Sequence, residues 1–140
     1  MKKSIRKKNK KIDKSNVLII IFTIIFLFLI SILTRYYGSA DIGDYSDTAK
    51  FFAGEYQAKL RTSHPIVYGL IFSPLVKITN SFIFLKLGSV LFLSLLILSI
   101  YYISDKNRKT LLLFVTTPTV WYMTPWISPI PLAGFLLLWS

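Results

Sequence analysis

Long uncharged stretches constrain this chain more than any other feature of its sequence. No Asp, Glu, Lys or Arg occurs in residues 17–34, 87–104 or 110–140. A soluble domain carries roughly 25% charged residues, whereas this chain of 140 residues has 16% charged and 54% hydrophobic residues. A helix needs about 20 apolar residues to cross the hydrocarbon core of a bilayer. The sequence therefore predicts an all-α integral membrane protein that folds as a polytopic helical bundle.

Composition and charge exclude several other classes. The apolar content argues against disorder, and the absence of cysteine, with a single histidine, argues against a disulfide scaffold or a structural zinc site. The net charge of +11 is concentrated, because eight of the 17 basic residues lie within residues 1–14. Basic residues directly before an apolar run are typical of the cytoplasmic flank of a span. We therefore expect a basic cytoplasmic tail over residues 1–15, a location in the cell membrane and no nucleic-acid partner.

The first transmembrane helix is predicted at residues 16–36. A cleaved signal peptide is the alternative, because the small residues at 38–40 resemble a cleavage site. The apolar run is longer than the roughly 7–15 residues of a signal-peptide core, which favours a retained span.

The second span has two interpretations. If residues 66–79 crossed the membrane, the basic cluster at 106–109 would lie outside; if they form an interfacial or re-entrant segment, the cluster returns to the cytoplasm. The positive-inside rule favours the second interpretation. We therefore predict a second span at 82–104 and a cytoplasmic turn at 105–109, with Lys77 and Lys86 extending outward to the interface.

The last 31 residues are uncharged but contain four prolines, at 118, 125, 129 and 131. Proline interrupts helices, so we predict a third span at 110–124, followed by an external turn and the start of a fourth helix at 125–140. Too few residues follow the turn for a complete crossing of about 20. The sequence is therefore expected to be a fragment or a truncated reading frame.

The predicted external loop, residues 37–81, contains most of the acidic residues and the only histidine, His64. Five apolar positions within it recur at spacings of three and four residues, which predicts an amphipathic juxtamembrane helix lying with its apolar face on the outer membrane surface. These positions are Tyr45, Ala49, Phe52, Tyr56 and Leu60.

Two short segments of this loop resemble a known family. Residues 41–49 read DIGDYSDTA and residues 64–68 read HPIVY. This arrangement is similar to the N-terminal part of GT-C superfamily membrane glycosyltransferases, in particular dolichyl-phosphate-mannose protein mannosyltransferases and bacterial aminoarabinose transferases. Asp41, Tyr45 and Ala49 match that family's spacing, and the His-Pro pair at 64–65 matches half of a His-Pro-Pro-Leu-like motif. Ile66 stands where a second proline is usual.

The resemblance implies transfer of a sugar from a polyprenyl-phosphate donor to a protein, glycan or lipid acceptor on the external face. Asp41 is then the candidate general base, because a carboxylate can take the proton from an attacking hydroxyl. Asp44 is the second catalytic candidate, and Arg61, His64 and Tyr45 are candidates for binding substrate, the first two as donors to the lipid phosphate.

Other interpretations remain open at these positions. Asp41 also suits a turn, Asp44 a helix cap, and His64 an extended residue before proline. We predict no metal site and no certain cofactor, although Asp41 and Asp44 offer oxygen ligands to a divalent cation. The alternative function is a non-catalytic multi-span protein, either an accessory subunit or a truncated gene product. The lack of an acidic residue in 124–132, where the family commonly has one, favours that alternative.

Overall fold

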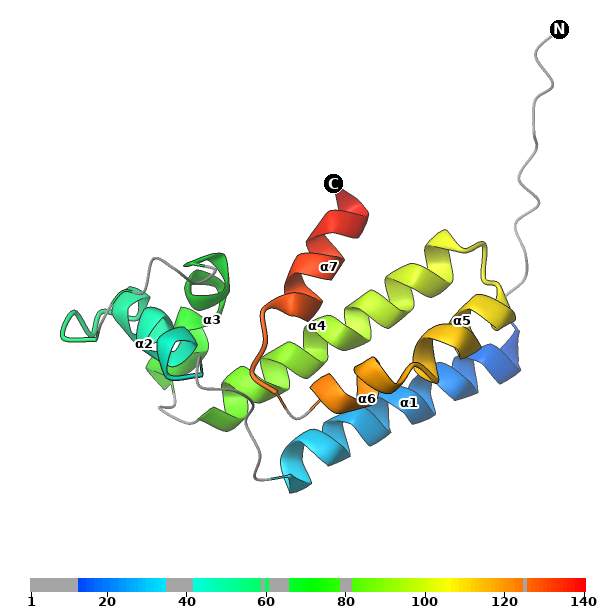
Figure 1. Cartoon of the computed structure of the whole chain (residues 1–140), viewed down its shortest axis with the longest axis horizontal. Coiled ribbons are helices and arrows are strands. Elements are labelled where there is room, and N and C mark those ends of the chain that lie inside the picture. The colour runs from blue at the N-terminus through cyan, green and yellow to red at the C-terminus, as the bar shows by residue number, and fades with distance from the viewer. Residues whose placement is uncertain (1–12, 35–41, 59, 61–65, 79–81, 125) are drawn as a thin grey trace, which may run out of the picture.

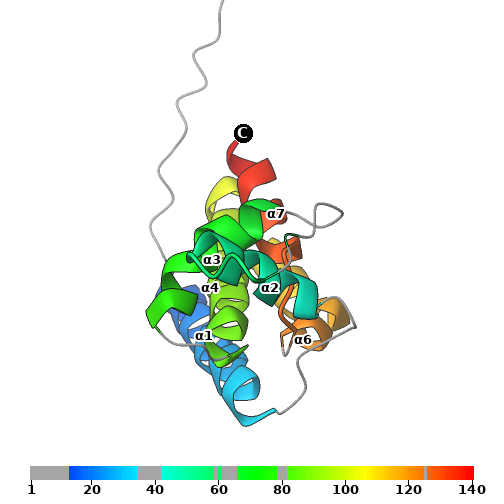
Figure 2. The ribbon, with the colours of Figure 1, turned by 90° about the vertical axis from the view of Figure 1, so that its left-hand side faces the viewer.

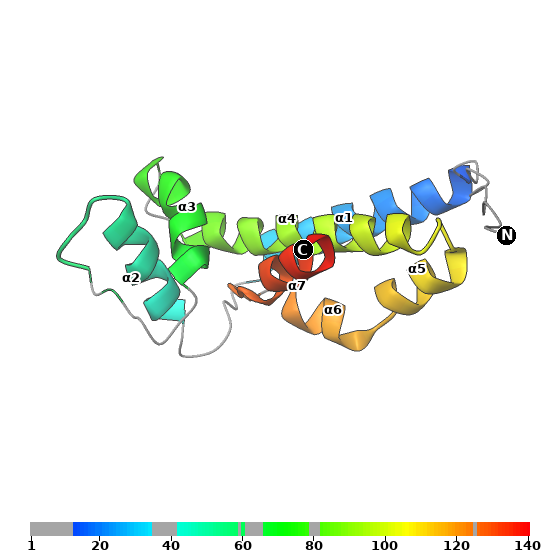
Figure 3. The ribbon, with the colours of Figure 1, turned by 90° about the horizontal axis from the view of Figure 1, so that it is seen from above.

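The computed structural model describes residues 13–34, 42–58, 60, 66–78, 82–124 and 126–140. Within these ranges the chain forms helices and no strands. Two helices, α1 (Lys14–Leu33) and α4 (Phe82–Ile103), are long and apolar enough to cross a membrane. They lie along the long axis of the molecule (Figures 1 and 3).

Helices α1 and α4 are antiparallel and are joined by polar contacts at both ends. At the start of α1, Asn16 Nδ2 donates a hydrogen bond to Tyr101 Oη at 3.1 Å. At its end, Lys86 Nζ donates to the carbonyl oxygen of Thr34 at 2.7 Å and to its hydroxyl at 3.0 Å. Because these contacts lie at opposite ends, they fix the register of the pair.

Lys86 does not extend outward as the sequence led us to expect. Its side chain is 0% exposed, whereas Lys77 is exposed. The prediction for Lys86 was wrong because it took water at the membrane interface as the only partner for the ammonium group. The end of α1 offers a carbonyl and a hydroxyl that an ammonium group can satisfy inside the protein.

A tight turn connects α4 to α5 (Arg108–Val115). The amide of Asp105 donates to the Tyr102 carbonyl at 3.2 Å, and the amide of Lys106 donates to the Tyr101 carbonyl at 2.9 Å. These bonds define a Schellman motif, in which Asp105 and Lys106 have positive φ angles of 54° and 59°. Asn107 then caps α5, its side-chain oxygen accepting from the Lys109 amide at 2.9 Å.

The predicted third helix is divided in two. Helix α5 ends at Val115, and α6 (Pro118–Met123) begins with a proline in its first turn. Thr117, which precedes that proline, is extended with ψ 123°, as steric contact with a proline ring favours. The break frees the Val115 carbonyl, which accepts a hydrogen bond from Trp121 Nε1 at 2.7 Å.

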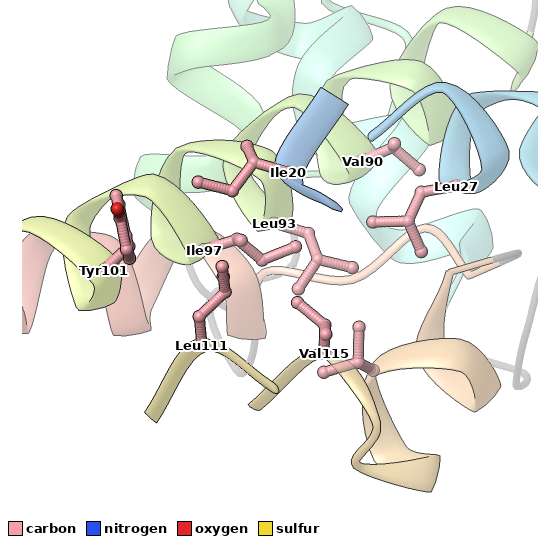
Figure 4. Packing of buried hydrophobic residues seen from close by; sticks show 9 residues of the cluster. Ile20, Leu27, Val90, Leu93, Ile97, Tyr101, Leu111 and Val115 are labelled. Atoms are coloured by element: carbon pink, nitrogen blue, oxygen red, sulfur yellow. The ribbon is translucent and has the colours of Figure 1, made fainter. Parts of the chain in front are cut away.

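A hydrophobic cluster holds α1, α4, α5 and α6 together (Figure 4). Its centre is the seam between α1 and α4, where Leu27 and Ile97 are fully buried. Leu111 and Val115 cover this seam from α5. The cluster comprises Ile20, Leu27, Val90, Leu93, Ile97, Tyr101, Leu111, Val115 and Val120.

Helices α2 (Ile42–Phe52) and α3 (Ile66–Ile78) lie at the end of the molecule where α4 starts (Figures 1 and 2). Helix α2 is shorter than its apolar spacing predicted. The amide of Glu55 donates to the Lys50 carbonyl and that of Gly54 to the Phe51 carbonyl, with Gly54 at φ 103°. This second Schellman motif ends the helix before Tyr56, which is exposed.

Helix α7 (Ile130–Trp139) runs along α4 in the same chain direction. At its beginning the Ser128 amide donates to Ser89 Oγ at 3.0 Å. At its end Trp139 Nε1 donates to Ser99 Oγ at 2.9 Å. If α4 crosses a membrane in one direction, α7 therefore starts to cross in that direction as well.

Candidate functional site

The candidate site is formed where α2 packs against α3. A glycine, Gly69, allows the close approach, because a Cβ atom there would lie 2.5 Å from Thr48 Cγ2 and 3.1 Å from the Ala49 amide nitrogen. Ala49 is fully buried in this contact. Two residues of the predicted apolar face of α2, Tyr45 and Ala49, thus pack on another helix of the protein. A protein helix covers these two residues, which the spacing of apolar residues alone does not reveal.

Two tyrosines connect α2 to the interior. The ring of Tyr45 packs edge-on against that of Tyr68, with centroids 5.5 Å apart. Tyr68 is fully buried, and its hydroxyl lies 3.1 Å from the Leu85 carbonyl and 2.8 Å from Ser89 Oγ. Burial raises the pKa of the Tyr68 hydroxyl.

Ser89 is the centre of a network that joins three elements. Its hydroxyl contacts Tyr68 of α3 at 2.8 Å, and it accepts from the Ser128 amide at 3.0 Å in the segment before α7. It also lies 3.3 Å from the Ser128 carbonyl oxygen. A single hydroxyl therefore positions α3 and the start of α7 on α4, in surroundings where each buried polar group needs a partner.

An apolar groove of about 380 Å³ lies between α3 and α7. Tyr68 forms part of its wall, so the groove adjoins the Tyr45–Tyr68 pair. The remaining lining residues are Val67, Pro129, Ile130, Leu132, Ala133 and Leu136.

The structure brings together only part of the site that the sequence predicted. Asp44 and Tyr45 lie in the first turns of α2, where a carboxylate suits the positive end of the helix dipole. Asp41, Arg61 and His64 lie outside the described residues. Within the described part of the chain, no three His, Cys, Asp or Glu side chains are grouped to hold a metal ion.

Sequence reasoning missed the roles of Tyr68 and Ser89 in this region and the partner of Lys86. Tyr68 ends the HPIVY segment, and a buried partner for its hydroxyl could have been expected because tyrosine hydroxyls usually find one. Ser89 carries no signal in an apolar helix that also contains Ser94 and Ser99. Lys86 was noticed, but its partner Thr34 is 52 residues away.

In comparisons with known proteins, no protein-family model, no curated protein and no solved structure matches this chain.

Proposed function

We propose that the chain is a membrane glycosyltransferase of the GT-C type, or the N-terminal part of one, which transfers a sugar from a polyprenyl-phosphate donor on the external face of the cell membrane. The adjacency of the α2 start, the Tyr45–Tyr68 pair and the apolar groove carries this proposal. A polyprenyl-phosphate sugar has a hydrocarbon chain and a polar head, and such a ligand needs an apolar groove next to polar side chains.

The exposure of α1 supports a membrane location. Large apolar side chains project from it, including Phe22 at 74% exposed and Leu33 at 76% exposed. A core helix of a soluble protein buries such residues, and a continuous exposed apolar surface marks contact with lipid or with another protein. The same argument applies to α4, on which Leu91 and Leu98 are exposed.

The distribution of charge supports a cytoplasmic N-terminus. The antiparallel pairing brings Lys14 of α1 to the same end as Arg108 and Lys109 of α5. Both basic segments then face the cytoplasm, as the positive-inside rule favours. Helices α2 and α3 lie at the opposite end of the pair (Figure 1), and we assign that end to the external face.

In the proposed reaction Asp41 acts as general base. It directly precedes α2, whose first turn carries Asp44. The carboxylate takes the proton from an acceptor hydroxyl while the hydroxyl oxygen bonds to the anomeric carbon and the polyprenyl phosphate leaves. Arg61 and His64 are proposed to bind the phosphate of the donor.

A test compares Asp41→Asn with Asp47→Asn in membranes from cells that express the chain. Each membrane preparation receives radiolabelled polyprenyl-phosphate mannose, glucose and aminoarabinose in turn, and release of polyprenyl phosphate is measured. We expect one donor to be consumed and Asp41→Asn to lower the rate by about 100-fold or more, whereas Asp47→Asn retains it. Equal rates in membranes with and without the chain, for all three donors, would favour the non-catalytic membrane protein instead.

A further inference from the structure

Basic residues distant in the sequence converge at one end of the helix pair. Lys14 begins α1, and Lys106, Arg108 and Lys109 surround the start of α5. The hydrogen bond between Asn16 and Tyr101 ties these two segments together. The opposing acidic side chains among the described residues at this end are Asp13 and Asp105. The four basic residues outnumber these two acidic ones, so the described part of this end carries a net positive charge.

The basic side chains between α4 and α5 extend from a hydrogen-bonded backbone. The Schellman bonds at Asp105 and Lys106 and the Asn107 cap fix the path from α4 to α5. Arg108 and Lys109 are exposed, so their charged groups are accessible. Asp13 and Asn107 each accept an amide hydrogen at a helix start, which leaves these helix ends capped by the protein itself.

The apolar surface adjacent to this end indicates where it lies. On α1, Leu18 is 67% exposed and Phe22 is 74% exposed, and both follow Lys14 within about two turns. A cluster of cations next to exposed apolar side chains matches the boundary between headgroups and acyl chains in a bilayer. Polybasic segments beside a span are attracted to anionic lipid in this position.

We infer that this end of the protein, formed by Lys14, Arg108 and Lys109, is a binding surface for anionic phospholipid headgroups. The phosphate and the net negative charge of the headgroup provide the complement to the cations, and the acyl chains lie along the exposed face of α1. This inference does not depend on sugar transfer, because the surface lies at the end of the pair opposite α2 and α3.

The experiment titrates the full chain, purified in a non-ionic detergent, with dioleoyl phosphatidylglycerol or dioleoyl phosphatidylcholine and counts bound lipids by native mass spectrometry. The test variant is Arg108→Gln/Lys109→Gln. The matched control is Lys50→Gln/Lys77→Gln, which removes two charges from α2 and α3. Lys14→Gln tests the contribution of the other helix.

We expect phosphatidylglycerol to bind more tightly than phosphatidylcholine, and its affinity to fall with increasing salt. The Arg108→Gln/Lys109→Gln variant is expected to lose about fivefold in phosphatidylglycerol affinity for each charge removed. Lys14→Gln, which removes one charge, should lose about fivefold in all. The control variant should bind phosphatidylglycerol like the unmodified chain. Equal affinity for the two lipids, equal losses in test and control variants, or tighter binding of a single-stranded oligonucleotide than of phosphatidylglycerol would each overturn the inference.

Discussion

The ammonium group of Lys86 lies 2.7 Å from the carbonyl oxygen of Thr34, the residue that caps the end of α1. The last carbonyls of a helix have no partner within it, and a cation near them is favoured by the helix dipole. Lys86 therefore serves as a cap for α1 that is supplied by α4. This explains how a lysine is accommodated in a buried position of an otherwise apolar helix.

Replacing Lys86 should weaken the α1–α4 pair. We expect Lys86→Met to lower the free energy of unfolding by about 1–3 kcal/mol, because the Thr34 carbonyl loses its donor. Thr34→Val keeps the carbonyl contact and removes the hydroxyl, which accepts from Lys86 and also donates to the Ile30 carbonyl at 2.7 Å, and it should cost less. Titration of the purified protein with sodium dodecyl sulfate, followed by circular dichroism, measures both. A larger loss in Thr34→Val than in Lys86→Met would show that the carbonyl contact is not the important one.

Gly88 should be sensitive to any added side chain. A Cβ atom there would overlap the ring of Phe72, which packs α3 on α4. We expect Gly88→Ala to destabilise the protein by about 1–3 kcal/mol through overpacking, and Phe72→Leu in the same chain to restore part of the loss. Gly43→Ala is the control, since its Cβ would have no atom within 4 Å. The same unfolding titration applies, and equal effects at the two glycines would contradict the packing of α3 on α4.

Ser89 and Ser94 form a matched pair for testing the hydrogen-bond network. Both are buried in α4, but Ser94 Oγ donates to the Val90 carbonyl of its own helix, whereas Ser89 joins α3 and the Ser128 segment. Ser89→Ala should cost about 1–3 kcal/mol because it removes the acceptor of a buried amide, and Ser94→Ala should cost less. Hydrogen exchange of the Ser128 amide provides a local readout, which should accelerate only in Ser89→Ala.

Stability should depend on pH through Tyr68. Burial raises the pKa of this hydroxyl above its ordinary value of 10.0. As pH rises, Tyr68 therefore ionises at a lower pH in the unfolded chain than in the folded protein. The contribution of Tyr68 to stability is therefore complete below about pH 10 and is lost above it. Unfolding titrations on both sides of this pH should show a loss that is smaller in Tyr68→Phe. An identical loss in that variant would assign the effect to other groups.

The two long helices were predictable because each coincides with a long apolar run of about the length that a bilayer crossing needs, and the structure has helices there. The ends of shorter helices were less well predicted. Apolar spacing suggested that the helix after Asp41 continues to Leu60, but the left-handed conformation of Gly54 ends it at Phe52. Glycine is the usual residue at that position, so this signal was present in the sequence and was outweighed by the periodicity.

The candidate site was less accessible to sequence reasoning because its contacts are long-range. Asp44 and Tyr45 could be placed at a helix start from local patterns. The partner of Tyr68, however, is a serine 21 residues away, and the groove requires the start of α7 to lie opposite Val67 and Tyr68 of α3. Neither apolar spacing nor charge specifies which small polar residue of α4 meets which helix.

Labelling of single cysteines tests most directly whether the α2–α3 end and the α4–α5 turn lie on opposite sides of the membrane. The chain has no native cysteine, and Gln57 and Asn107 are both exposed. Gln57 is preferred to Ser46 of α2 as the labelling position, because Ser46 is only 4% exposed. In intact cells, a membrane-impermeant maleimide should label Gln57→Cys at once and Asn107→Cys only after lysis. Labelling of both positions in intact cells, or of Asn107→Cys alone, would contradict the proposed arrangement and with it an external site for sugar transfer.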